Sequence, residues 1–172
     1  MKTTSRSKNF FKVKVKIFFF KVKSQGQGQT IFVTGEAGIG KTTLVETFLK
    51  DASSRMKILV GRGQCLEQYG AGEAYLPVLD ALSRLAREPL GQIVVEQLRL
   101  LAPSWLVQLP RLLQPTELQS LREQTSQVTR ERMLREIAET IEAITAEVPF
   151  ILLLEDLHWR KAESFLFNLG CI

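Results

Sequence analysis

The sequence predicts an α/β domain in which helices pack against a parallel β-sheet, and three segments carry this prediction. Residues 30–34 form a short run of β-branched and aromatic residues that ends at a glycine. Residues 129–147 have the apolar spacing of an amphipathic helix, and residues 150–154 are an uninterrupted apolar run. A helix followed by a fully buried strand is typical of parallel sheets. At 172 residues, the chain is long enough for one domain with a sizeable core.

The first 28 residues differ from the rest, and we interpret them as a basic, aromatic tail and linker before a domain at residues 29–172. Residues 11–17 alternate apolar residues with lysines, and three phenylalanines follow, which is a strand pattern with one lysine face. Three interpretations remain open: an edge strand protected by its lysines, a segment that contacts anionic lipid of a membrane, or a segment with no role. Residues 25–29 alternate glutamine and glycine and are typical of a linker.

A glycine-rich loop directly follows the strand at residues 30–34. It matches the pattern G-x-x-x-x-G-K-[ST] in full, with the residues Gly35, Glu36, Ala37, Gly38, Ile39, Gly40, Lys41 and Thr42. The glycines let backbone N–H groups point inward at phosphates, the lysine reaches the β and γ oxygens, and the threonine hydroxyl binds Mg²⁺. Residues 44–49 then have the spacing of an amphipathic helix, whose N-terminus favours anions. The sequence therefore predicts a binding site for a nucleoside triphosphate.

The region after this first helix is predicted to be mainly helical. Residues 57–63 are a second strand, and leucines then recur at every third position, at Leu76, Leu79, Leu82 and Leu85. Residues 93–101 are another apolar helical stretch, and Trp105 among its leucine neighbours is interpreted as a core residue. In the long helix at residues 129–147, Arg132 and Glu136 are spaced as an ion pair on the solvent side.

Two acids end the apolar strand at residues 150–154. Glu155 and Asp156 lie at its carboxyl end, which is the edge where ligands of open α/β sheets bind. Beside a phosphate loop, one carboxylate would hold Mg²⁺ and the other would orient or deprotonate the attacking water. Position favours Glu155 near the metal and Asp156 near the water, and the division of roles stays open. His158 follows, as a structural residue or as a sensor of the γ-phosphate.

Positive charge is concentrated at the N-terminus. The formal net charge is +5, yet eight of the 23 basic residues and no acid precede Gln25, which leaves 15 basic against 18 acidic residues, a net of −3. The folded part is therefore not expected to bind nucleic acid.

The two cysteines predict neither a zinc site nor a disulfide framework. Cys65 and Cys171 lie far apart and form no C-x-x-C pair. No apolar run reaches the roughly 18 residues that a membrane-spanning helix needs, and the N-terminus lacks the pattern of a secretory signal. We expect a cytoplasmic protein in a reducing compartment.

Three strings of residues resemble the ATPase module of large bacterial regulators. They are the loop and its helix start at residues 35–44, residues 63–65 leading into residues 75–82, and the string Leu-Leu-Leu-Glu-Asp-Leu-His-Trp at residues 152–159. The module is an AAA-type, origin-recognition-like ATPase domain, similar to the STAND signalling ATPases, and the resemblance covers residues 29–159. It implies a P-loop NTPase fold, a three-layer sandwich with a parallel sheet and a large helical insert between the second and third strands. It also implies ATP and Mg²⁺ as ligands, and a switch between nucleotide states rather than fast turnover.

By position, the resemblance assigns site residues to the loop, the first helical turn and the acidic strand end. Gly35, Gly38, Gly40, Lys41, Thr42 and Thr43 would hold the phosphates and the metal. Glu155 and Asp156 would serve the metal and the water, so the candidate metal ligands are Thr42, Glu155 and Asp156, and the candidate catalytic residues are Lys41, Glu155 and Asp156.

The sequence also departs from this family. Arg160 and Lys161 follow the His-Trp pair, where the family commonly has an acid. In related proteins, the strand between the phosphate-loop strand and the acidic strand comes later in the chain, and little sequence remains here to form it. We therefore expect a sheet that is incomplete at the C-terminus, in which residues 30–34 and 150–154 pair directly or leave unpaired edges. The arginine finger, sensor residues and lid would also lie further on.

Two functions follow from these features. The first is an ATP-binding module of a truncated signalling regulator, with weak or no hydrolysis alone, that acts with protein partners or with missing C-terminal domains. The alternative is a non-catalytic interaction fragment or decayed remnant, whose helices at residues 76–147 dock on partner domains. A small-molecule kinase is disfavoured, because no lid arginines are recognised.

Overall fold

The structure, a computed structural model, describes residues 14–21, 29–64 and 75–157 of the chain. The expectations for His158, Arg160, Lys161 and the two cysteines lie outside these residues. The strands are β1 (Lys14–Lys21), β2 (Gln29–Gly35), β3 (Leu59–Gln64) and β4 (Phe150–Leu157). The helices are α1 (Lys41–Arg55), α2 (Leu76–Leu85), α3 (Gly91–Leu101), α4 (Pro103–Leu106), the 3₁₀ helix η1 (Pro110–Leu112), α5 (Pro115–Thr125) and α6 (Arg130–Glu147).

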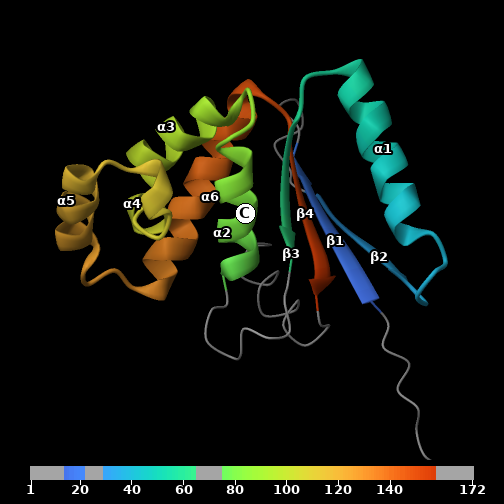
Figure 1. The fold of residues 1–172 in the computed structure, drawn as a ribbon, viewed down its shortest axis with the longest axis horizontal. Helices are drawn as coiled ribbons and strands as arrows, with labels where there is room; N and C mark the ends of the chain where they lie inside the picture. The colour runs from blue at the N-terminus through green and yellow to red at the C-terminus, as the bar shows by residue number, and fades with distance from the viewer. Residues whose placement is uncertain (1–13, 22–28, 65–74, 158–172) are drawn as a thin grey trace, which may run out of the picture.

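The described strands form one mixed sheet in the order β2-β1-β4-β3. β3 and β4 are parallel, whereas β1 is antiparallel to both of its neighbours. It follows that β2, β4 and β3 run in one direction and β1 runs against them (Figure 1). The predicted α/β class is confirmed. The predicted parallel pairing holds between β3 and β4, and it is wrong for β1, which is antiparallel to both of its neighbours.

β1 occupies the position between the phosphate-loop strand and the acidic strand. Ile17 pairs with Phe32 of β2 on one side and with Leu154 of β4 on the other. The expectation that residues 30–34 and 150–154 pair directly or leave unpaired edges is therefore wrong, because β1 pairs with both strands. The edge-strand interpretation of the N-terminal segment is wrong as well, since β1 is an inner strand. The period-two pattern predicts a strand but contains no information on its neighbours.

Helices cover both faces of the sheet because β4 is apolar on both. Ile151 and Leu153 pack with Val45 and Leu49 of α1. On the opposite face, Phe150, Leu152 and Leu154 join the larger core, which the helices α2 to α6 complete. Figure 1 shows α1 on one side of the sheet and these helices on the other. None of the described helices is both long and apolar enough to cross a membrane.

Trp105 is a core residue, as predicted. Its side chain is 1% exposed and belongs to the larger core. The indole Nε1 donates a hydrogen bond to the carbonyl of Met133 at 2.7 Å, which joins α4 to α6. The Tyr75 ring lies edge-on to it, with 5.3 Å between the ring centroids.

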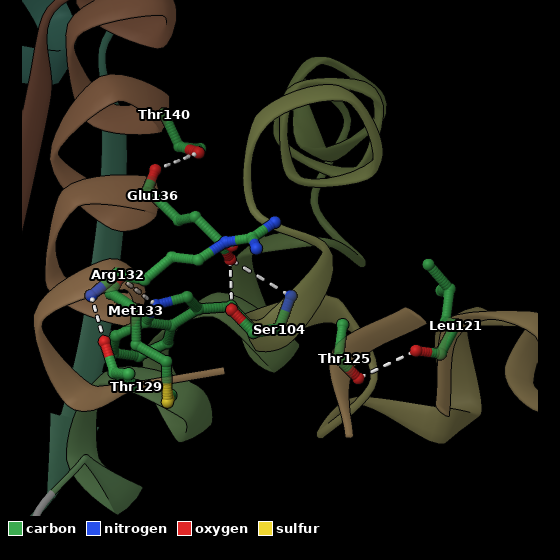
Figure 2. Close-up of polar contacts among 9 residues, drawn as sticks. Ser104, Leu121, Thr125, Thr129, Arg132, Met133, Glu136 and Thr140 are labelled. Atoms are coloured by element: carbon green, nitrogen blue, oxygen red, sulfur yellow. Dashed lines mark hydrogen bonds and ion pairs between the residues drawn. The ribbon is translucent and has the colours of Figure 1, made fainter. Parts of the chain in front are cut away.

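A buried carboxylate also joins α4 to α6. Glu136, which we expected on the solvent side, is only 6% exposed. It accepts hydrogen bonds from the backbone N–H of Ser104 at 3.1 Å, from the Ser104 hydroxyl, and from Arg132 Nε at 3.1 Å (Figure 2). The spacing of Arg132 and Glu136 indicates the ion pair correctly, but the contact with Ser104 spans 32 residues and leaves no local signal in the sequence.

A Glu136→Ala variant is expected to lower the free energy of unfolding by about 1 to 3 kcal/mol. The reason is that it leaves the buried N–H and hydroxyl of Ser104 without their acceptor. Urea denaturation of the full chain measures the loss. Glu139→Ala, an exposed change on the same helix, is the matched control. An equal loss in both variants would contradict a specific role for the buried carboxylate.

Candidate nucleotide-binding site

The glycine-rich loop connects β2 to α1 and turns at two left-handed residues. Gly38 has a φ of 85° and Gly40 a φ of 94°, values that side-chain-bearing residues rarely adopt. A Cβ at either position would meet nothing within 4 Å, so the backbone conformation, and not space, requires glycine there. Gly40, which the motif requires, and Gly38, which stands at one of its variable positions, therefore both have a structural cause in the turn itself.

The N-terminus of α1 opens directly from this turn. Within the described chain, no side chain caps it and its first turn contains no acid. The Leu44 N–H donates to the Gly40 carbonyl at 2.9 Å, which is the first helical bond of this end. The preceding N–H groups and the positive end of the helix dipole therefore face the loop, an arrangement that favours an anion.

Lys41 is the first residue of α1, and its ammonium group lies on the loop. The side chain is 9% exposed, and Nζ donates to the carbonyls of Gly35 at 2.8 Å and Glu36 at 2.6 Å. Both acceptors are uncharged. Phosphate oxygens would be stronger partners for the same ammonium, because they carry negative charge and the carbonyl oxygens do not.

Two threonines follow Lys41 in the first turn of α1. Both Thr42 and Thr43 are exposed. The carbonyl of Thr43 accepts a hydrogen bond from the Thr47 hydroxyl at 2.7 Å. The exposed position of Thr42 leaves its hydroxyl open to solvent at the loop.

The acidic end of β4 lies at the same edge of the sheet as the loop. Val15 of β1 pairs with Thr34 of β2 on one side and with Leu157 of β4 on the other. Neighbouring strands are about 4.8 Å apart, so β2 and β4 lie about 10 Å apart across β1. The structure thus brings the start of the loop and the acidic strand end to one edge.

Glu155 pairs with Gln64 of β3 in the strand ladder. Its charge also acts on the Arg62 guanidinium of the same strand. The Glu155 side chain is half-buried. Asp156 is the next residue of β4, and its side chain lies outside the described part.

Arg62 and Glu46 form an ion pair close to Glu155. Arg62 of β3 donates to both carboxylate oxygens of Glu46 of α1, with 2.9 Å between Nη2 and Oε2. The pKa of the Arg62 guanidinium is raised, chiefly by the hydrogen bond to Glu46. Burial lowers this pKa, and the charges of Glu46 and Glu155 raise it. The pair thus links the helix of the loop to the strand beside the acids. The two residues are 16 positions apart and on different elements, so no local pattern reveals them.

These features define a class of protein: an α/β domain with a phosphate-binding loop between a strand and an uncapped helix N-terminus. Comparison with protein families is more specific. The family model described as the AAA ATPase domain matches residues 18–170, and the chain belongs to this family. It is therefore a nucleotide-binding ATPase module of the P-loop type. The search of curated proteins and the search of solved structures gave no match.

Proposed function

We propose that the chain is the ATP-binding module of a regulatory ATPase of the origin-recognition and STAND type, with weak or no hydrolysis by itself. The observation that supports this proposal most is the position of Lys41 Nζ, within 2.8 Å of the Gly35 carbonyl and 2.6 Å of the Glu36 carbonyl. In this proposal, the fold is the three-layer P-loop sandwich, and α2 to α6 are an insert between β3 and β4. The bound nucleotide acts as a switch that partner domains read.

The phosphates would bind on the loop and the first turn of α1. The set of nucleotide-binding residues that we propose is Gly35, Glu36, Ala37, Gly38, Ile39, Gly40, Lys41, Thr42 and Thr43. The N–H groups of the turn and the helix N-terminus would donate to the phosphate oxygens, and Lys41 would exchange its two carbonyl partners for the β and γ oxygens.

Mg²⁺ fits the donors at this edge of the sheet. Thr42 supplies a hydroxyl oxygen, and Glu155 and Asp156 supply carboxylates, which are the hard oxygen ligands that Mg²⁺ prefers. The described residues contain no group of three or more acids, histidines or cysteines that would hold a metal alone. Mg²⁺ commonly binds through one or two carboxylates together with substrate phosphates, so we propose that it arrives with the nucleotide. When bound, it would neutralise charge on the phosphates.

The hydrolytic roles in this proposal divide between the two acids. Glu155 stands near the metal and Asp156 orients or deprotonates the attacking water. The Arg62 guanidinium is close to Glu155, but it donates hydrogen bonds to both carboxylate oxygens of Glu46. Arg62 is therefore not assigned to the transferred phosphate in this proposal.

Thermal unfolding of the full chain tests ATP binding. A ligand at a hundred times its Kd adds about 2.7 kcal/mol to the free energy of unfolding, so Mg·ATP should raise the melting temperature above that in Mg²⁺ alone. A cooperative transition that Mg·ATP leaves unchanged would contradict the proposal and favour a non-catalytic interaction fragment.

A Glu155→Gln variant is expected to bind ATP in the absence of metal with the wild-type affinity. Mg²⁺ should strengthen ATP binding about tenfold less in this variant than in the wild type. The reason is that the amide keeps the shape of the side chain but removes the charge that attracts the cation. Fluorescence titration with a labelled ATP analogue, with and without EDTA, measures the gain. Glu139→Gln on α6 is the control. If Mg²⁺ strengthens binding equally in all three proteins, Glu155 does not hold the metal.

A further inference from the structure

A cavity of about 830 Å³ runs along β3, away from the phosphate loop. Its base is formed by residues 58–60 and Arg62, one wall by α1 from Glu46 to Ser53, and the other wall by Arg84, Leu85 and residues 87–90. We call this cavity the β3 groove. Neither the loop at residues 35–40 nor Glu155 lines it.

The base of the β3 groove is an open strand edge. β3 is the last strand on its side of the described sheet. The Leu59 N–H donates to the Pro149 carbonyl at 2.9 Å, toward β4. In a parallel ladder, alternate residues direct both backbone groups to the same side, so Val60 and Arg62 direct theirs away from β4. Both residues line the groove, which therefore presents the donors and acceptors that a further strand needs.

The walls add an apolar surface and a surplus of positive charge. Leucines, isoleucine, valine and proline line much of the groove. Its charged residues are four basic (Lys50, Arg62, Arg84 and Arg87) and two acidic (Glu46 and Glu88), a net of +2. Arg62 is paired with Glu46, and Arg84 is paired with Asp80 at 3.0 Å. Lys50, Arg87 and Glu88 are exposed and form no ion pair with another described residue, so a net of +1 remains once the two ion pairs are set aside.

We propose that the β3 groove binds an extended acidic segment of a partner protein, which pairs with Val60 and Arg62 as an additional strand. The backbone of the segment would supply the hydrogen bonds, its apolar side chains would lie against the helical walls, and its acids would lie near Lys50 and Arg87. A second copy of this chain is a poorer occupant, because it would bring the same surplus of positive charge to the groove. The proposal does not rest on nucleotide binding.

Fluorescence anisotropy with a labelled peptide of alternating glutamate and valine tests the proposal on the full chain. The peptide is expected to bind the wild type, and Val60→Pro is expected to weaken binding at least tenfold. Proline removes the outward N–H and leaves the bonds to β4 in place. Arg87→Glu should weaken binding several-fold without touching the strand. Lys57→Glu, an exposed change outside the groove, is the matched control and should bind as the wild type does.

Two altered peptides separate strand addition from other modes of binding. A lysine-valine peptide of the same length tests charge, and a glutamate-valine peptide methylated at alternate backbone nitrogens tests strand pairing. Equal binding of either peptide would overturn the proposal, as would the absence of binding up to about 1 mM. It would also be overturned if both Val60→Pro and Arg87→Glu bound normally, or if sedimentation showed a dimer that Val60→Pro dissociates. In that last case a second copy would be the occupant.

Discussion

An Ile17→Pro variant is expected to lose the cooperative unfolding transition of the full chain. Ile17 lies in the middle of β1 and pairs with Phe32 on one side and Leu154 on the other. Proline has no N–H to donate and is not accommodated in a strand with two neighbours. The lost ladder hydrogen bond leaves a buried carbonyl without its donor, which costs about 1 to 3 kcal/mol. The fixed ring geometry adds strain between two paired neighbours, against a total stability of about 5 to 15 kcal/mol for an ordinary domain. Because β1 also joins β2 to β4, its loss separates the phosphate loop from the acids.

Circular dichroism during heating measures this effect. Lys8→Pro, which lies outside β1, is the control and should melt as the wild type does. If Ile17→Pro melts at the wild-type temperature, β1 contributes nothing to the sheet. In that case the domain would begin at residue 29, as the composition of the sequence predicts.

A Lys41→Ala variant is expected to bind ATP about 10 to 100 times more weakly and to fold normally. The Lys41 ammonium is held on the loop by two carbonyls, and hydrogen bonds to charged groups contribute about 1.5 to 3 kcal/mol each. Equilibrium dialysis with labelled ATP measures the affinity.

Lys50→Ala is the matched control, because it removes an exposed lysine from the same helix without touching the loop. Equal affinities for the two variants would show that Lys41 does not contact the phosphates. The comparison also separates the loop from general electrostatic attraction, which both substitutions reduce alike.

The parts of the fold that the sequence predicts well are those with a local cause. The run at residues 30–34 lies within β2, the run at residues 150–154 lies within β4, and α6 differs from the predicted helix at residues 129–147 by one residue. At Gly38 and Gly40, the motif correctly anticipates a turn, because left-handed backbone is what glycine permits.

The parts that the sequence does not predict arise from contacts between distant residues. The pattern at residues 11–17 indicates a strand, but its partners β2 and β4 are selected by the whole fold. The spacing of Glu136 from Arg132 is that of an ion pair on the solvent side of a helix. Packing of α4 against α6 nevertheless buries Glu136. Arg62 gains its importance only because α1 brings Glu46 to β3. Each of these features requires the tertiary structure.

Isothermal titration calorimetry of the unmodified chain with Mg·ATP tests the central claim most directly, that the loop from Gly35 to Thr42 binds the triphosphate. The result that we predict is saturable heat with one site per chain, and a lower affinity when EDTA removes Mg²⁺. The absence of heat at millimolar Mg·ATP, from a chain that still melts cooperatively, would contradict the claim.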